Sequence, residues 1–102
     1  MKRFFAPLLA ALALIALAPN ALADRVSHDE ALRAVQAGQA LPLARIMQIA
    51  LQHAPGEIVE VELERDDGRL IYEVEVLGAS GRVRKVEIDA RTGAVLDIED
   101  ED

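Results

Sequence analysis

The chain of 102 residues contains no cysteine and no tryptophan. Without cysteine it can form no disulfide and offers no thiolate as nucleophile or metal ligand. It also offers no cysteine to which a lipid anchor could be attached. Any folded domain in this sequence must therefore be held together by packing alone.

Residues that usually carry catalysis are also scarce, because the sequence has two histidines and three serine or threonine residues. Ser27 is interpreted as a helix cap and Ser80 as a turn residue. His28 follows that cap, and His53 ends a predicted helix, where a cation interacts favourably with the helix dipole. We therefore predict that the protein is not an enzyme, with no catalytic, cofactor-binding or metal-binding residues.

The first 23 residues have the pattern of a secretory signal peptide. Lys2 and Arg3 precede an apolar stretch from Phe4 to Ala18, and Ala21-Leu22-Ala23 has the A-x-A form of a cleavage site. The alternative is a membrane anchor, but the apolar run is shorter than the ~20 residues needed to span a bilayer. We predict cleavage after residue 23 and a mature protein that is not embedded in a membrane.

Positive charge is in short supply beyond residue 23. That part of the chain holds nine basic and 18 acidic residues, a net charge of −9. Such an acidic surface repels nucleic acid and anionic lipid. The expected partner is accordingly a protein, and nucleic acid is excluded.

Two helices are predicted at the start of the mature chain. Ser27 and Glu30 form a capping-box pattern, and Gly38 is placed to end the first helix. The second begins at Pro42 and stops at Pro55-Gly56. Its apolar residues have the spacing of a core-facing stripe: Leu43, Ile46, Met47, Ala50 and Leu51.

From Ile58 the hydrophobic period changes to 2, which indicates strands, and Asp67-Gly68 between two alternating runs predicts a hairpin. A two-residue turn there sets apolar residues opposite one another on one face: Leu63 with Tyr72, Val61 with Val74, and Val59 with Val76. On the other face it sets like charges opposite one another, which is unfavourable: Glu62 with Glu73, and Glu60 with Glu75.

A third strand, Arg82 to Asp89, follows a loop of three residues in which Gly81 is left-handed, and this register places Lys85 beside Glu75. A turn at Asp89–Gly93 leads to a fourth strand, Ala94 to Ile98, before an acidic tail, 99–102. The predicted fold class is α+β. Two N-terminal helices precede a four-stranded antiparallel meander, and the second helix packs on its apolar face.

The stretch Leu41 to Leu96 resembles the PepSY domain, and the lead-in Ala31–Gly38 before Leu41-Pro42-Leu43 extends the resemblance over the predicted mature chain, residues 24–98. The resemblance rests on three segments, which are His53-Ala54-Pro55-Gly56, the hairpin around Asp67-Gly68, and the run from Val86 to Leu96 with its Asp89-Ala90-Arg91-Thr92-Gly93 turn. It implies a short periplasmic member of the family. In longer relatives the domain inhibits or chaperones a protease, or lies outside a membrane-embedded reductase, and short members accompany two-component signalling systems.

Our leading hypothesis is therefore a periplasmic module that binds a protein, such as a protease or the sensor of a two-component system, and modulates it. The candidate binding face is the outer face of the sheet: Glu60, Glu62, Ile71, Glu73, Glu75 and Lys85. The first helix is an alternative cover for Ile71. Pairing of two copies along an edge strand also stays open.

A second hypothesis comes from a different class, a small cation-binding or stress-buffering protein that uses the acidic face and the tail. Calcium takes six to eight oxygens from a shaped loop, which a flat stripe of glutamates does not supply. A solvated sheet face is the ordinary explanation of these residues.

Overall fold

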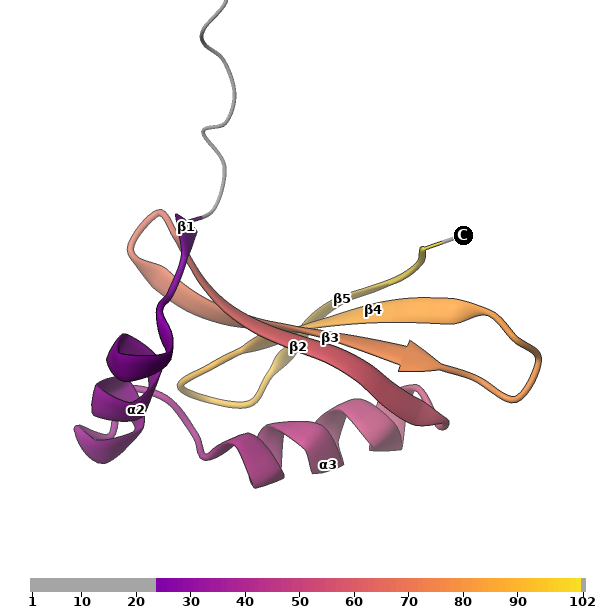
Figure 1. The fold of residues 1–102 in the computed structure, drawn as a ribbon, viewed down its shortest axis with the longest axis horizontal. Helices are drawn as coiled ribbons and strands as arrows, with labels where there is room; N and C mark the ends of the chain where they lie inside the picture. Colours follow the sequence, from indigo (N-terminus) through magenta and orange to yellow (C-terminus); the bar gives the residue numbers. More distant parts are fainter. Residues whose placement is uncertain (1–23, 102) are drawn as a thin grey trace, which may run out of the picture.

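The computed structural model describes residues 24–101, so the predicted signal peptide and Asp102 lie outside the described residues. Figure 1 shows a single antiparallel sheet with both helices on one side of it. In chain order the elements are β1 (Asp24–Arg25), α2 (His28–Gln36), α3 (Leu43–His53), β2 (Glu57–Asp66), β3 (Arg69–Leu77), β4 (Val83–Asp89) and β5 (Val95–Asp100). The strands lie side by side in the order in which they occur in the chain.

Helix α2 begins and ends where the sequence predicted. The Ser27 Oγ accepts from the Glu30 amide at 3.2 Å, and the Glu30 carboxylate accepts from the Ser27 amide at 3.4 Å, so the capping box is formed. Gly38 follows the helix with a φ of +76°, a conformation that favours glycine.

Helix α3 packs on the sheet as predicted, but its buried face differs from the predicted stripe. Ile46, Ile49 and Ala50 are buried, whereas Leu43 and Leu51 are 47% and 36% exposed. A Cβ on Gly93 would lie 2.9 Å from the Ile49 Cδ1, which places Ile49 directly against the turn before β5. The helix is therefore rotated towards Ile49 by a contact that its own periodicity does not encode.

The first hairpin confirms the predicted turn and most of the predicted register. Asp67 and Gly68 both have positive φ, which is typical of a two-residue hairpin turn, and Leu63 opposes Tyr72. The expected pairing of Val59 with Val76 is wrong, since a bulge leaves Val59 unpaired and 52% exposed and Ile58 takes its place. Two adjacent apolar residues compete for one inward position here, and the bulge selects Ile58.

The second hairpin has the predicted three-residue loop. The Gly78 amide donates to the Arg82 carbonyl at 2.9 Å, and Gly81 has a φ of +89°. The register that follows opposes Glu75 to Lys85, as the sequence predicted.

The sheet has five strands, so the prediction of four is corrected at its first edge. Strand β1 was missed because two residues carry no detectable period; it pairs Asp24 with Arg65 and Arg25 with Glu64. The four predicted strands form the expected meander, β2 to β5.

The residues expected to form an acidic tail continue the last strand. β5 extends to Asp100, and the Glu101 amide donates to the Val83 carbonyl at 2.8 Å. Asp100 accepts from Arg82 at 3.2 Å and Arg84 at 3.4 Å. Arg82 and Arg84, which lie far from these residues in sequence, therefore help to extend β5.

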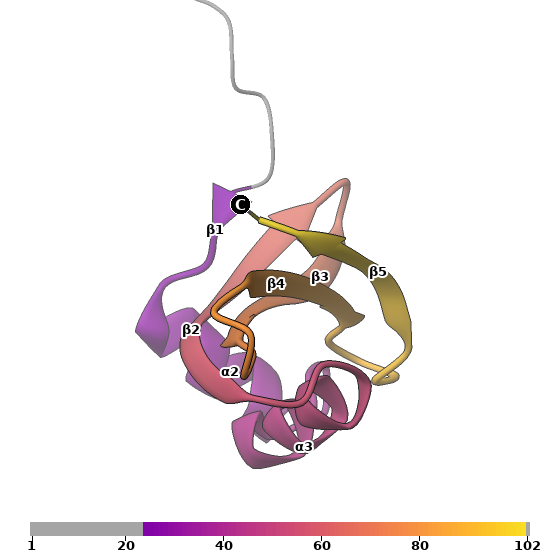
Figure 2. The ribbon, with the colours of Figure 1, turned by 90° about the vertical axis from the view of Figure 1, so that its right-hand side faces the viewer.

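The core lies between α3 and the concave face of the sheet, which curves around the helix in Figure 2. Tyr72 is 4% exposed, and its hydroxyl donates to the Leu41 carbonyl at 3.3 Å. The largest fully buried side chains are those of Ile46, Ile88, Val74, Val76 and Val86. All acidic side chains of the central strands are thereby directed to the opposite face.

Candidate functional site

A row of carboxylates crosses the outer face of the sheet from β2 to β5. Its four members are consecutive cross-strand partners: Glu62, Glu73, Glu87 and Asp97. We call this set the carboxylate row. Directly opposed side chains on neighbouring strands have Cβ atoms about 4.5–5.5 Å apart, so the repulsion between members is short-range.

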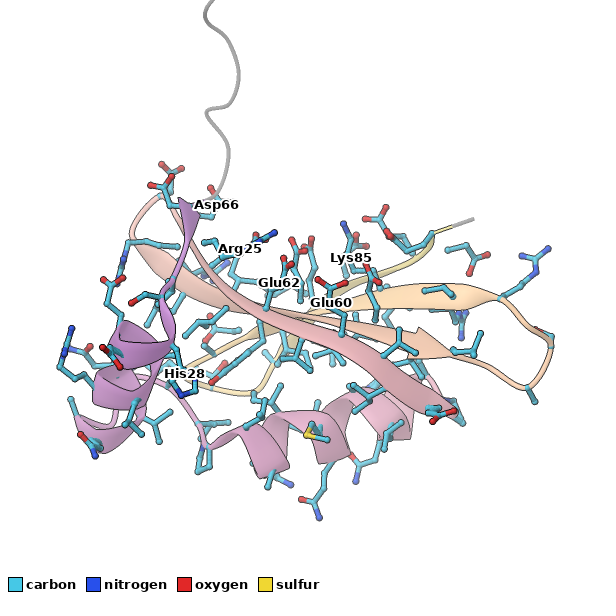
Figure 3. All side chains as sticks on the ribbon, viewed as in Figure 1. Arg25, His28, Glu60, Glu62, Asp66 and Lys85 are labelled. Atoms are coloured by element: carbon cyan, nitrogen blue, oxygen red, sulfur yellow. The ribbon has the colours of Figure 1, made fainter. Side chains whose placement is uncertain are left out.

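A second row lies beside the first and contains a cation. Its members are Glu60, Glu75, Lys85 and Glu99, again consecutive partners. The Lys85 Nζ lies 3.7 Å from a carboxylate oxygen of Glu101. Figure 3 shows Lys85, Glu60 and Glu62 projecting from the sheet on the side away from the helices.

A further cation on this face comes from the shortest strand. Arg25 of β1 binds the Glu62 carboxylate at 2.9 Å. The contact explains how one end of the carboxylate row is neutralised. The structure places the residues of the predicted face together and adds Arg25, which the sequence did not reveal.

The pKa values of the acidic side chains record the crowding. Burial, followed by the neighbouring Glu64, raises the pKa of Glu73. Burial, followed by the charge of Glu73, raises the pKa of Glu87, and burial with the charge of Glu60 raises that of Glu75. The pKa of Glu60 is raised by its contact with Glu62.

Burial and the neighbouring carboxylates shift the pKa of Lys85 in opposite directions. Partial burial alone would lower the pKa of Lys85, but the surrounding carboxylates, Glu73 and Glu101 first, raise it above its usual value. The ammonium is therefore held in its charged form in the middle of the acidic face.

Ile71 has the same strand parity as Glu73 and Glu75 and opposes Glu64 and Asp89. Ile71 is half-buried. Helix α2 does not cover it, because α2 packs on the inner face of the sheet and Ile71 lies on the outer face (Figure 1). The structure therefore groups all six predicted residues on one face. Ile71 lies at the end of this face that is near the Asp67-Gly68 turn.

Several members of this face were not predicted, namely Glu64, Glu87, Asp97, Glu99 and Glu101. Parity would have found Glu87, because it lies between the inward Val86 and Ile88. The residues of β5 could not be placed from the sequence. A second bulge, between Glu87 and Ile88, changes the register of β5 against β4.

Three carboxylates of this face approach one another closely. Single oxygens of Glu62, Glu64 and Glu73 all lie within 4.8 Å of one another. This is fewer oxygens than calcium takes in protein sites, so water would have to complete such a coordination sphere.

Two candidates for catalysis, Ser27 and His53, and the turn residue Asp89 make structural contacts. Ser27 caps α2, and His53 Nδ1 lies 3.0 Å from the Ile49 carbonyl of its own helix. Asp89 accepts from the amides of Thr92 and Arg91, the main reason why its pKa is lowered, and it also binds Arg69 at 3.2 Å. These contacts organise helix ends and a turn.

Comparison with known proteins identifies a family. The family described as "Peptidase propeptide and YPEB domain", abbreviated PepSY, matches residues 40–99. An uncharacterized protein of Bacillus subtilis (strain 168), YkoJ, is 36% identical over 55 residues, which cover 54% of this chain. The match spans about a third of that relative, 32% of its length.

No solved structure matches the chain significantly. Within residues 24–101, no helix is long and apolar enough to cross a membrane.

Proposed function

This chain belongs to the PepSY family, and on that premise we propose that it is a non-catalytic module that binds a partner protein and modulates its activity. The family description names peptidase propeptides, which supports a regulatory module associated with a peptidase. A protease or the sensor of a two-component system is the proposed class of partner. The signal-peptide pattern of residues 1–23 supports a periplasmic location.

The observation that carries the proposal is the carboxylate row. Four carboxylates in direct cross-strand opposition destabilise an isolated sheet, and packing in this fold does not require them. A binding surface gives them a role, because a complementary partner relieves the repulsion and gains electrostatic steering. Ile71 and Lys85 then lie within the contact area.

Crosslinking in living cells tests this function. A photoreactive residue is placed at Ile71 or at Lys85 on the outer face, and at His53 on α3 as a matched control on the opposite side of the sheet. We expect one reproducible protein to be captured from the first two positions and to be absent from the third. Capture of no protein, or of a second copy alone, would contradict the proposal.

Cation binding is the second candidate function, favoured by the convergence of Glu62, Glu64 and Glu73. Binding to the folded state raises stability by about 1.4 kcal/mol when free metal is ten times Kd. The melting temperature is measured with calcium or zinc for the native chain and for Glu64→Gln. A transition that neither metal moves would eliminate this candidate.

A further inference from the structure

The first edge of the sheet is only partly covered. β1 pairs with Arg65 and Glu64, and the Val26 amide donates to the Leu63 carbonyl at 2.8 Å. The chain then leaves the edge at Ser27 to begin α2 (Figure 1). Among residues 24–101, no strand pairs with β2 on this side between Glu57 and Glu62. Strand alternation directs the N–H and C=O of Val61, like those of Leu63, outward from that edge.

An apolar groove lies beneath the same part of β2. Its volume is about 480 Å³, and it is lined by Val61 and Leu63 of β2 together with residues of α2 and the start of α3. Leu32 and Leu43 line it and remain 53% and 47% exposed. Exposed leucines that line a concave surface next to an open strand edge are typical of a peptide-binding site.

β1 shows which side chains a strand needs at this edge. Arg25 points to the outer face and binds Glu62 at 2.9 Å (Figure 3). Val26, the next residue, is buried in the core and lines the groove. A strand that pairs with this edge of β2 is therefore complementary to it when a basic residue is followed by an apolar one.

We propose that the open edge of β2 and this groove bind an extended segment of a partner protein in which basic and apolar residues alternate. The basic side chains lie beside Glu60 and Glu62, and the apolar ones enter the groove next to Val61. The bulge at Val59 ends the regular edge, and Leu63 already pairs with Val26, so the paired segment is short, about three residues or ~10 Å. This inference rests on the proposed binding function and names the partner's chemistry.

A second copy of the chain does not fit the edge. Pairing through β2 would set Glu60 and Glu62 of two copies against each other, and pairing of β2 with β5 would bring Asp97 and Glu99 to the same carboxylates. Like charges in direct opposition disfavour both arrangements. Charge complementarity therefore selects a basic partner segment over self-association.

The test is binding of synthetic peptides to the isotope-labelled protein, purified from cells that express the full chain. The probe is Lys-Val-Lys-Val-Lys, and the comparison peptides are Glu-Val-Glu-Val-Glu and the block peptide Lys-Lys-Lys-Val-Val. We expect the alternating basic peptide to bind most tightly and to shift the amide signals of Val59, Val61 and Leu32. Equal binding of the acidic peptide, no binding at millimolar concentration, or shifts confined to β5 would overturn the inference.

Exposed variants separate the groove from the edge charges. Leu32→Ser is expected to weaken the basic peptide about ten-fold through lost apolar contact, and Glu60→Gln about two- to five-fold. The matched controls are Leu96→Ser, 39% exposed on the far edge, and Glu99→Gln, which lies in the same row on β5. If the controls weaken binding as much as the test variants, the site is not at β2.

The same variants distinguish this inference from the function on which it rests. Loss of peptide binding in Leu32→Ser, together with loss of the partner captured from Lys85, supports both. If the partner is still captured from Lys85 while no peptide binds at β2, the binding function stands and the edge site is wrong. If no partner is captured but the peptide binds, the edge site stands.

Discussion

Glu62 on β2 and Glu73 on β3 are direct cross-strand partners, and Glu73 in turn opposes Glu87 on β4. Arg25 binds Glu62, while Glu73 lies on β3, the middle strand of the sheet. Burial first, and then neighbouring carboxylates, raise the pKa values of Glu73 and Glu87. Repulsion between the carboxylates of the outer face is therefore greatest when all of them are ionised.

The first prediction concerns pH. For a carboxyl whose folded pKa is raised, the stabilising contribution is complete below the usual value of 4.5 and is lost as pH rises through the folded value. The free energy of unfolding should therefore increase as pH falls through the raised pKa values of these carboxyls towards 4.5. Asp89, whose pKa is lowered, acts oppositely, and its contribution is lost only as pH falls below its usual value of 3.8. Urea unfolding at a series of pH values measures the curve.

The variant Glu73→Gln should be more stable than the native chain at pH 7 and should flatten this pH dependence, since it removes a member of the carboxylate row. Glu57→Gln, at the exposed start of β2, is the matched control and should change neither quantity. A native chain whose stability does not rise as pH falls towards 4.5 would show that the carboxylates of the row do not interact.

The second prediction concerns Tyr72. Because the side chain is 4% exposed, Tyr72→Ala should lower the free energy of unfolding by about 3–5 kcal/mol, which is comparable to the whole stability of so small a domain. Tyr72→Phe removes only the hydroxyl that donates to Leu41 and should cost about 1 kcal/mol. Circular dichroism during thermal unfolding checks both. A stable, fully folded Tyr72→Ala would be incompatible with the inner-face register of β3.

The third prediction compares two glycines. Gly68 and Gly93 have φ values of +79° and +83°, but a Cβ at Gly68 meets nothing within 4 Å, whereas one at Gly93 meets Ile49 and Leu41. Gly68→Ala should cost about 1 kcal/mol for backbone strain, and Gly93→Ala about 1–3 kcal/mol more for overpacking. Equal losses in chemical denaturation would mean that the turn does not press on α3.

The fourth prediction concerns the end of β5. Removal of residues 99–102 should lower stability by about 1–3 kcal/mol, because it deletes backbone pairing with β4, including the bond from Glu101 to Val83. Asp100→Asn keeps that pairing and loses the ion pairs with Arg82 and Arg84, so it should cost less than about 1 kcal/mol. A truncated chain with an unchanged melting temperature would restore the interpretation of these residues as a tail.

Local chemistry in the sequence was sufficient to predict several elements. The capping box at Ser27, the hairpin turn at Asp67-Gly68 and the three-residue loop with Gly81 all formed where expected. Each depends on residues within a few positions of one another, so no distant contact is needed to specify it. The opposition of Glu62 with Glu73 and of Lys85 with Glu75 then follows from turn length alone.

Tertiary structure decided the features that depend on distant residues. The contact between Ile49 and the turn at Gly93 sets the rotation of α3, and the pairing of Arg25 with Glu64 creates a strand of two residues that no periodicity could reveal. Cross-strand cations extend β5 beyond Ile98. The sequence determined the turns, the register and the acidic face, because these are local; the rotation of the helix, the added edge strand and the groove required the packed chain, because their stabilising contacts join residues far apart in sequence.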